Sequence, residues 1–361
     1  MGTGIAGWGA AIALAKAGRR VLIVGRKGVR GESTPAAAGI LDPVLEMSPR
    51  NPLLALGMKA FREYPGRLRA LRRATHLDLG YARTGMLCIA FTKEEEKELK
   101  VRMRWQKRAG MPVVWKDRTG LVKIEAALNP RARGGLFYPA VGRIQPKKLL
   151  AGLRRYAKEL GISVIDHRRG SSVRIEKGRA AGVRIGRAFF QAPVVVNAKG
   201  SWAGVGHKRR RRLPIVPARG QILTLKSARL KIRTIVHSLD GAYVVPWGKN
   251  QYLLGSTVER VGFKPYTTRR GLQSILARCD QLIPGIRLFK YADTWAGLRP
   301  FPKDRLPLIG PTSVSGFYLA AGFYRSGILI GCLAGELLAQ GIIRGKMPGL
   351  IRPFDPRRFK I

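Results

Sequence analysis

Apolar and polar positions along the chain follow recognisable periods, and the first of these predicts an opening helix. Small and apolar side chains recur at helical spacing over residues 8–18, and the pattern stops at Gly18. The run "RRVLIVG", residues 19–25, is short and largely apolar, as in a buried strand. With the glycines that precede them, these runs predict the loop, helix and strand of a βαβ unit.

The next part of the chain predicts charged helices and a short strand. Residues 51–73 and 92–109 combine helical spacing with many charged positions. Residues 111–117, "MPVVWKD", have the β-branched and aromatic content of a strand. Residues 134–161 are interpreted as a loop followed by a helix, with Pro146 near the first turn of that helix.

The second half of the chain is richer in strands. Residues 172–200 hold three short β runs joined by glycine turns and end in a buried strand at 194–196. Residues 215–258 are strongly β in character, and residues 269–284 have the pattern of a helix. Residues 317–343 predict a strand, a glycine turn and a long helix.

The order of these elements predicts an α/β protein with two interleaved domains. An α/β unit is followed by a mixed insert, a return to buried strand, a β-rich insert and a closing strand and helix. The chain has 361 residues, enough for two domains, and its 45% of hydrophobic residues excludes a disordered chain. It contains no internal repeat and no low-complexity linker, which argues against two domains joined end to end.

The net charge of the chain is informative about binding partners and says little about the fold. Lys and Arg total 68 against 21 Asp and Glu, a formal net charge of +47. Such a field attracts nucleic acid, acidic lipid and anionic metabolites without sequence preference. The densest run, residues 208–212, lies among glycines and precedes Pro214, so we expect an exposed loop. It has no interleaved aromatic residues, as a platform for stacked bases would. A generally basic surface, specific nucleic-acid binding and an altered sequence all stay open.

Cysteine and histidine spacing gives no sign of a metal site. The three cysteines are far apart, without a CxxC pair, and the four histidines have no metal-ligand spacing. We therefore expect no metal and a reducing, cytoplasmic location, since no signal peptide is visible. The apolar stretch 317–343 is interrupted by Arg325, Glu336 and several glycines, which argues against a membrane span.

The first residues have a spacing that suits a nucleotide pyrophosphate. Gly2, Gly4 and Gly7 form a Gly-x-Gly-x-x-Gly loop that opens a helix. Small residues there let backbone N–H groups approach a phosphate, which the helix N-terminus also attracts. Two expected parts differ: only Met1 precedes the loop, where a buried strand is usual, and Gly25 stands where an acid normally binds the adenosine ribose. Loss of that charged hydrogen bond costs about 1.5–3 kcal/mol of cofactor binding.

Several longer segments resemble one family in the order in which they occur. They are "GESTPAAAGILDP", "VVNAKGSWA", "PARGQILTL", "AYVVPWGKNQYLLGSTVERVGF", "TWAGLRPFPKDRLPLIGP" and "GFYLAAGFYRSGILI". Together with the glycine loop they resemble the glycine oxidase branch of the FAD-dependent D-amino-acid oxidase family. The resemblance covers nearly the whole chain.

The resemblance implies a fold and a reaction. The fold is a Rossmann-type FAD-binding domain interleaved with an α+β substrate domain built on a large antiparallel sheet. The FAD domain would comprise residues 1–45, 143–213 and 296–361, and the substrate domain residues 46–142 and 214–295. FAD would oxidise a small amino acid to its imine, with dioxygen as the second substrate and hydrogen peroxide as a product. The imine of glycine would feed synthesis of the thiamine thiazole, and a homo-oligomer is expected because relatives are often tetramers.

The resemblance also assigns residues to the substrate. Arg299 in "WAGLRP" matches the arginine that binds the substrate carboxylate, and Arg is the side chain best suited to bidentate recognition of that group. Tyr243 in "AYVVP" matches a tyrosine whose hydroxyl contacts the same carboxylate, and Arg325 in "FYRSG" matches a second arginine nearby. A hydride transfer to flavin needs an oriented substrate rather than a protein nucleophile.

The remaining matches concern the cofactor. They fall in six places: the pyrophosphate loop, the end of the first strand, the segment beside the flavin ring, the adenine contact, the strand-end loop and the start of the last helix. These residues are Gly2, Gly4, Gly7, Arg26, Thr34, Ala37, Ala38, Gly39, Val173, Ala198, Gly200, Gly322, Tyr324, Ser326, Gly327, Ile328 and Leu329.

Departures from the family pattern leave alternatives open. Arg26 beside Gly25 is also compatible with a 2′-phosphate and NADP, although the later motifs favour FAD. Phe323 and Ser326 stand where many relatives have His and Asn, and Lys199 replaces a small residue. Three hypotheses therefore remain: an oxidase of a small amino acid, an FAD enzyme that oxidises a secondary amine on tRNA or another polyanion, and a non-catalytic relative.

Overall fold

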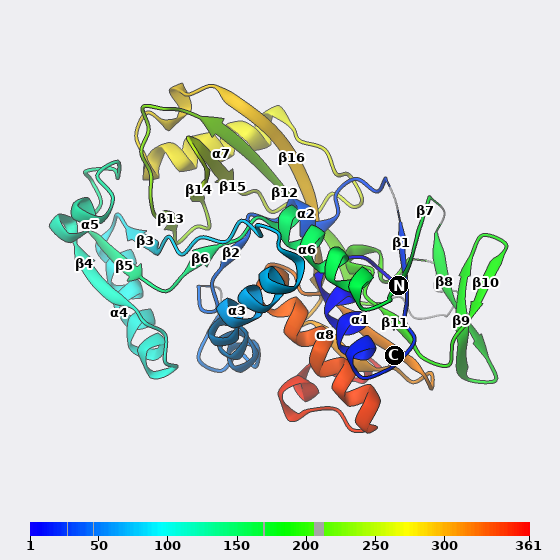
Figure 1. Cartoon of the computed structure of the whole chain (residues 1–361). Coiled ribbons are helices and arrows are strands. Elements are labelled where there is room, and N and C mark those ends of the chain that lie inside the picture. Colours follow the sequence, from blue (N-terminus) through cyan, green and yellow to red (C-terminus); the bar gives the residue numbers. More distant parts are fainter. Residues whose placement is uncertain (27, 46, 169, 206–212) are drawn as a thin grey trace.

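The computed structural model describes residues 1–26, 28–45, 47–168, 170–205 and 213–361. The fold is mixed α/β, with one large sheet on one side and a group of helices and smaller sheets on the other (Figure 1). The chain passes between these two parts several times, as predicted for interleaved domains. The domain boundaries themselves remain a prediction. The arginine-rich run 208–212, predicted as an exposed loop, lies outside the described residues.

The half of the fold that contains the glycine loop is built around short strands that pair in parallel. β1 (Leu22–Arg26) pairs in parallel with β7 (Ser163–His167), and β11 (Val195–Asn197) pairs in parallel with β18 (Phe317–Ala321). β17 (Leu308–Pro311) is added antiparallel to β18. Parallel strands need covered faces, and the middle of β1 is buried, whereas β7 has no buried residue and carries Asp166 and His167 at its end.

The first two residues join these two small sheets. The amino group of Met1 donates to the carbonyl of Val196 at 2.7 Å, and the N–H of Ala198 donates to the carbonyl of Met1 at 2.8 Å. On the other side, the N–H of Gly2 donates to the carbonyl of Val24 at 2.8 Å. Met1 and Gly2 therefore lie between β1 and β11 and carry the hydrogen bonding from one sheet to the other.

Helix α1 (Ile5–Lys16) packs closely on helix α8 (Gly327–Arg344). Glycines make this approach feasible: a Cβ on Gly9 would lie 2.7 Å from Cα of Cys332, and one on Gly335 would meet the backbone of Ala6 and Ala10. A Cβ on Gly331 would meet Ile5, and one on Gly335, a turn later, would meet Ala10, so the contacts advance in the same direction along both helices. The two helix N-termini therefore lie at the same end of the pair, and open helix N-termini attract anions.

By length and composition α8 could cross a membrane, in contrast to the expectation drawn from its interruptions. However, 61% of that apolar window is buried inside the fold, where it packs on α1 and α3 (Leu53–Thr75). A core helix passes the same test of composition.

The other half is dominated by an eight-stranded sheet in the order β16-β12-β15-β14-β13-β3-β5-β4 (Figure 1). The sheet is mixed rather than purely antiparallel, because β13 and β3 pair in parallel. Helix α7 (Arg269–Leu282) packs on β12, β14 and β15 and buries Ile275 and Cys279 in the core between them. The strands are β3 (Met86–Ala90), β4 (Val114–Asp117), β5 (Gly134–Tyr138), β12 (Ile215–Lys226), β13 (Ile235–Ser238), β14 (Tyr243–Gly248), β15 (Gln251–Gly255) and β16 (Tyr291–Pro302).

Shorter elements complete the fold. The further helices are α2 (Ser33–Ala36), α4 (Lys93–Arg108), α5 (Arg118–Ile124) and α6 (Pro146–Glu159). The further strands are β2 (Ile40–Leu41) with β6 (Gly142–Arg143), and the hairpin sheet β8 (Ser171–Glu176), β9 (Arg179–Ile185) and β10 (Ala188–Gln191). Single 3₁₀ turns are at Gly200–Trp202, Ile286–Leu288, Gly349–Phe354 and Pro356–Phe359.

One predicted element is wrong. The first part of residues 134–161 was expected to be a loop, but it forms β5, which lies between β3 and β4. The two glycines that suggested a loop serve close strand pairing instead. A Cβ on Gly134 would lie 2.9 Å from the carbonyl oxygen of Lys116, and one on Gly135 would lie 3.3 Å from the carbonyl carbon of Cys88.

Candidate functional site

The glycine loop begins α1 without a capping side chain of its own. Gly4 is the N-cap, and the first turn has no acidic residue. Gly2 has a φ of +108°, and its Cβ would collide with the carbonyl of Ala198. A Cβ on Gly7 would collide with the carbonyl of Gly2 and lie 3.5 Å from Ala198 Cβ. The loop is therefore a cradle made of backbone, and it fits the pyrophosphate of the FAD implied by the sequence.

The segment 33–39 lies across this loop. The N–H of Ile5 donates to Oγ1 of Thr34 at 3.4 Å, so Thr34 sits over the start of α1. The N–H of Ala37 donates to the carbonyl of Thr34, Ala37 itself has an extended backbone, and Gly39, after Ala38, turns with a φ of +69°. A Cβ on Gly39 would collide with the carbonyl of Ile144. The structure thus brings the predicted flavin segment next to the predicted pyrophosphate loop.

Strand β16 holds these cofactor segments together. The hydroxyls of Ser33 and Ser201 both donate to the carbonyl of Leu298, at 2.5 and 2.6 Å. The N–H of Leu298 donates to the carbonyl of Gly31 at 2.8 Å. Gly200, with a φ of +54°, begins the turn that carries Ser201. Leu298 is the residue before Arg299, so the predicted cofactor segments are anchored one residue from the predicted substrate arginine.

A cationic cavity lies at the carboxyl ends of β1 and β7. It has a volume of about 610 Å³, and its lining includes Arg26, Arg30, Arg168, Trp202 and Phe263. The rings of Trp202 and Phe263 have centroids 5.5 Å apart. Ligands of open α/β sheets bind at the carboxyl ends of the strands, and this cavity has arginines for phosphates and aromatic faces for a base.

Val173, the predicted adenine contact, and Lys199, a departure from the family pattern, lie on the neighbouring elements. Val173 on β8 packs with Met1 and Leu22 against the core that contains Val24. Lys199 extends its ammonium group to the carbonyls of Ser171 and Val205, at 3.0 and 3.1 Å. Burial, with a smaller contribution from Arg26, lowers the pKa of Lys199 to about 8. A phosphate nearby would reverse that effect.

The loop before α8 lies on β16. Gly322 has a φ of +80° and Tyr324 one of +49°, and the N–H of Tyr324 donates to the carbonyl of Pro300 at 3.1 Å. The Ser326 hydroxyl donates to the carbonyl of Phe323 at 2.9 Å, and among the described residues no side chain caps α8. The N–H groups of Leu329 and Ile330 donate to the carbonyl of Ser326, so the open N–H groups at this helix start are those of Gly327 and Ile328. Ile328 and Leu329 are buried behind them.

Arg299 is held rigidly on the large sheet. Its two terminal nitrogens donate to the carbonyl of Thr257 at 2.9 Å and to the hydroxyl of Ser256 at 2.8 Å. The guanidinium lies flat over Gly220, where any Cβ would collide with it. Glycine at 220 is therefore needed for this placement of the guanidinium.

Tyr243 lies beside this guanidinium. Its side chain is 8% exposed, and its hydroxyl occupies the space where a Cβ on Gly255 would be. Burial raises the pKa of Tyr243, while Arg299 and Ser256 oppose that effect. The structure therefore brings together two of the three predicted substrate residues.

Arg325 approaches the same strand from the cofactor side. Its guanidinium nitrogens are 3.8 and 3.9 Å from the Cβ position of Gly241, in the turn that leads into Tyr243. Its guanidinium carbon is 5.6 Å from the centroid of the Tyr324 ring, and burial lowers its pKa. The three predicted substrate residues are thus distributed around the start of β14.

Sequence reasoning missed Glu259, which binds the hydroxyl of Thr257, the residue whose carbonyl accepts a hydrogen bond from Arg299. Glu259 accepts hydrogen bonds from Gln221 at 2.7 Å and from Thr257 at 2.5 Å, and it pairs with Arg219. Burial raises the pKa of Glu259, but the bonds from Arg219, Thr257 and Gln221 outweigh it and hold that pKa below its usual range. The signal was present in the quoted segment "GSTVE", residues 255–259, whose polar side chains interrupt an otherwise apolar strand region.

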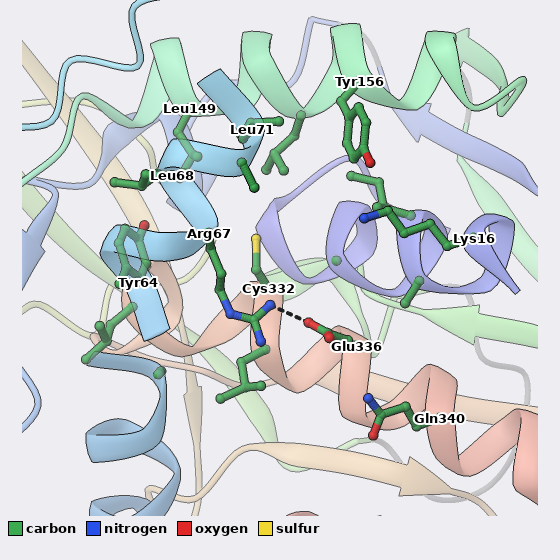
Figure 2. Close-up of a pocket in the computed structure, with 18 of the residues that line it drawn as sticks. Lys16, Tyr64, Arg67, Leu68, Leu71, Leu149, Tyr156, Cys332, Glu336 and Gln340 are labelled. Atoms are coloured by element: carbon green, nitrogen blue, oxygen red, sulfur yellow. Dashed lines mark hydrogen bonds and ion pairs between the residues drawn. The ribbon is translucent and has the colours of Figure 1, made fainter. Parts of the chain in front are cut away.

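A second cavity lies elsewhere. It is an apolar groove of about 440 Å³ between α1, α3, α6 and α8, with the ion pair of Arg67 and Glu336 at its side (Figure 2). Of the predicted site residues only Leu329 lines it. The chemistry predicted for this chain therefore belongs to the β16 region and not to this groove. Among the described residues, no group of three or more His, Cys, Asp or Glu could hold a metal ion.

Comparisons with known proteins agree with this geometry. A family model described as "FAD dependent oxidoreductase" matches residues 1–341. The chain is 29% identical to a glycine oxidase of Geobacillus kaustophilus, over 99% of this chain and 96% of that protein. It is 27% identical to the bifunctional protein ThiO/ThiG of Trichormus variabilis, of whose length it spans 54%. The crystal structure of glycine oxidase from Geobacillus kaustophilus matches with a TM-score of 0.89 and 28% identity, covering 99% of this chain and 97% of that one.

Proposed function

The chain belongs to the family of FAD-dependent oxidoreductases, and from that premise we propose that it oxidises glycine or another small amino acid at Cα. The chemistry that FAD supplies when bound is acceptance of a hydride from Cα, followed by reoxidation by dioxygen with release of hydrogen peroxide. The protein's part is to bind the substrate, orient its Cα–H bond and exclude water.

The observation that carries this proposal is the fixed guanidinium of Arg299 beside the Tyr243 hydroxyl. Hydrogen bonds to Thr257 and Ser256 use one donor on each terminal nitrogen, and a guanidinium has five donors in all. The remaining donors suit a bidentate contact with a carboxylate. The Tyr243 hydroxyl would add a third hydrogen bond to the same group.

The distance between substrate and cofactor is set by β16. Leu298 binds the cofactor segments through its backbone, and Arg299 binds the carboxylate through its side chain. A carboxylate bound by Arg299 would therefore lie one residue along β16 from the backbone that anchors the cofactor segments. Arg325 at the turn of Gly241 adds positive charge on the other side.

The similarity to glycine oxidase and to ThiO/ThiG supports glycine as the substrate and the thiamine thiazole as the destination of its imine. The polyanion hypothesis rests on the net charge alone, and the densest basic run lies outside the described residues.

The proposal is tested with the purified holoenzyme in air. We expect yellow protein that consumes oxygen and releases hydrogen peroxide with glycine, and with sarcosine or D-alanine as comparison substrates. Colourless protein that does not take up added FAD would overturn the assignment of the cofactor site. Yellow protein that is inactive with every small amino acid, but is reduced by an amine-bearing RNA, would favour the polyanion hypothesis.

A further inference from the structure

Gly25 leaves β1 without a carboxylate at its end, and the neighbouring strand fills the space. In the parallel pair of β1 and β7, Gly25 is in register with Asp166. A Cβ on Gly25 would lie 2.7 Å from Oδ1 of Asp166 and 2.6 Å from Cγ2 of Thr3. The carboxylate of Asp166 therefore lies over Gly25 and reaches toward the glycine loop, in the position that a side chain at 25 would otherwise occupy.

The carboxylate is held in this orientation from behind. Nη2 of Arg154 on α6 donates to Oδ2 of Asp166 at 2.6 Å. Oδ1, the other oxygen, is the one directed toward Gly25 and Thr3. The Asp166 side chain is 27% exposed, so the carboxylate is only partly covered by the protein. An anchored carboxylate with one oxygen directed at the nucleotide loop is arranged to accept hydrogen bonds from hydroxyl groups.

The surroundings of Asp166 also face the cofactor. The cationic cavity described above is lined by Arg26, which follows Gly25, and by Arg168, which comes two residues after Asp166 and just beyond the end of β7. Glu32, in the flavin segment, has a pKa raised by burial and, to a smaller degree, by Asp166. The charge of Asp166 is therefore felt on the side of the sheet where the nucleotide loop and segment 33–39 meet.

We propose that Asp166 binds the ribose hydroxyls of the adenosine half of FAD and so replaces the acid that position 25 lacks. The acid has moved from the end of one strand to the same level of the next, and the glycine makes room for it. This inference rests on FAD as the cofactor but not on any substrate.

The test compares FAD with its 2′,3′-dideoxyadenosine analogue, which lacks the hydroxyls in question. Dissociation constants are measured from flavin fluorescence for the wild type and for Asp166→Asn, which keeps the side chain's shape. We expect the wild type to bind FAD about tenfold to a hundredfold more tightly than the analogue. We expect Asp166→Asn to bind FAD as weakly as the wild type binds the analogue, and to discriminate little between the two.

Glu32→Gln is the matched control, because it removes the other carboxylate close to this site. We expect it to keep the discrimination between FAD and the analogue. Asp166→Glu, which keeps the charge, should retain part of that discrimination and guards against a folding defect in the asparagine variant.

Equal discrimination by the wild type and Asp166→Asn would overturn the proposal, as would its loss in Glu32→Gln alone. Neither readout needs an amino-acid substrate. A failure to oxidise glycine would therefore count against the proposed function and leave this assignment standing.

Discussion

The glycine loop at the start of α1 and the arginine site on β16 are both arranged to bind anions, but by different means. The loop uses backbone: Gly2 and Gly7 are required because any Cβ would strike a carbonyl. The β16 site uses side chains, above all Arg299, which is held by Thr257 and Ser256. An anion site made of backbone N–H groups tolerates substitutions at neighbouring side chains, as the proposed replacement of an acid at position 25 by Asp166 illustrates. When the carboxylate is bound chiefly by one guanidinium, no other side chain can take over its hydrogen bonds.

From this difference between the glycine loop and the arginine site, we expect substitution of Arg299 to have the largest effect on activity. Arg299→Lys keeps the charge but loses the planar fork and the fixed hydrogen bonds. Removing one partner of a buried charged contact costs about 2–5 kcal/mol, so kcat/KM for glycine should fall about thirtyfold to several thousandfold. Steady-state kinetics measure this fall, and the flavin content should stay at the wild-type level.

Arg287→Lys is the control for that variant, since the Arg287 side chain is 68% exposed and pairs with Asp280 rather than with a predicted site residue. Wild-type kinetics in Arg299→Lys would remove the basis for calling this the carboxylate site.

The glycine loop and the helix that follows it should be sensitive to the size of substituted side chains rather than to their charge. Gly335→Leu would drive a side chain into the backbone of Ala6 and Ala10, at the contact between α1 and α8. Overpacking of this kind costs about 1–3 kcal/mol, and it moves the helix start that binds the pyrophosphate. Thermal unfolding should occur at a lower temperature, and flavin should be lost more readily.

Gly349→Ala is the matched control, because a Cβ on Gly349 meets nothing within 4 Å. If Gly335→Leu unfolded like the wild type and kept its flavin, the two helices would not be coupled as described.

Tyr243 should contribute less than Arg299 to the same site. Tyr243→Phe removes one hydroxyl and leaves the ring and the guanidinium, so the substrate loses a single hydrogen bond. We expect about a tenfold rise in KM for glycine with a smaller change in kcat. Tyr291→Phe, at a 50% exposed tyrosine, should behave as the wild type. A fall in kcat alone would mean that the hydroxyl acts in the chemical step instead of binding.

The smallest effect concerns the pH dependence of stability at Lys199. Burial lowers the pKa of Lys199 to about 8 from 10.5, so without FAD the folded state releases its proton before the unfolded state does. Between these values the unfolded state binds more protons, and stability should rise with pH. Below about pH 8 both states are protonated and the cost of burying the charge is complete.

Lys199→Met should remove this contribution, so the difference in unfolding free energy between the variant and the wild type should shrink from pH 8 to pH 10. Urea unfolding at several pH values measures it. A constant difference across that range would show that Lys199 is not buried as a cation.

Elements with local signals were predictable from the sequence, and those that depend on tertiary pairing were not. Helix α4 was placed to within a residue or two, and it has a capping box of Thr92 and Glu95 at its start. Strand β5 was taken for a loop because its glycines have a local meaning in turns and a different one beside Cys88. The five residues of β3 are buried on both faces, so they show no alternation and were not assigned.

The site shows the same division. Arg299 and Tyr243 were found because the segments around them carry the resemblance, and the structure places them together. Asp166 was not found, because its role follows from register with Gly25, about 140 residues earlier in the chain. No period or motif reports a pairing of that kind. The domain boundaries, the oligomeric state and the individual cofactor contacts remain predictions.

The most direct measurement of the central claim is anaerobic mixing of the holoenzyme with glycine, followed through the visible flavin absorption. The account predicts rapid loss of that absorption in the wild type and a much slower loss in Arg299→Lys with the same flavin content. Absence of any loss in the wild type, or equal rates in the two proteins, would contradict it.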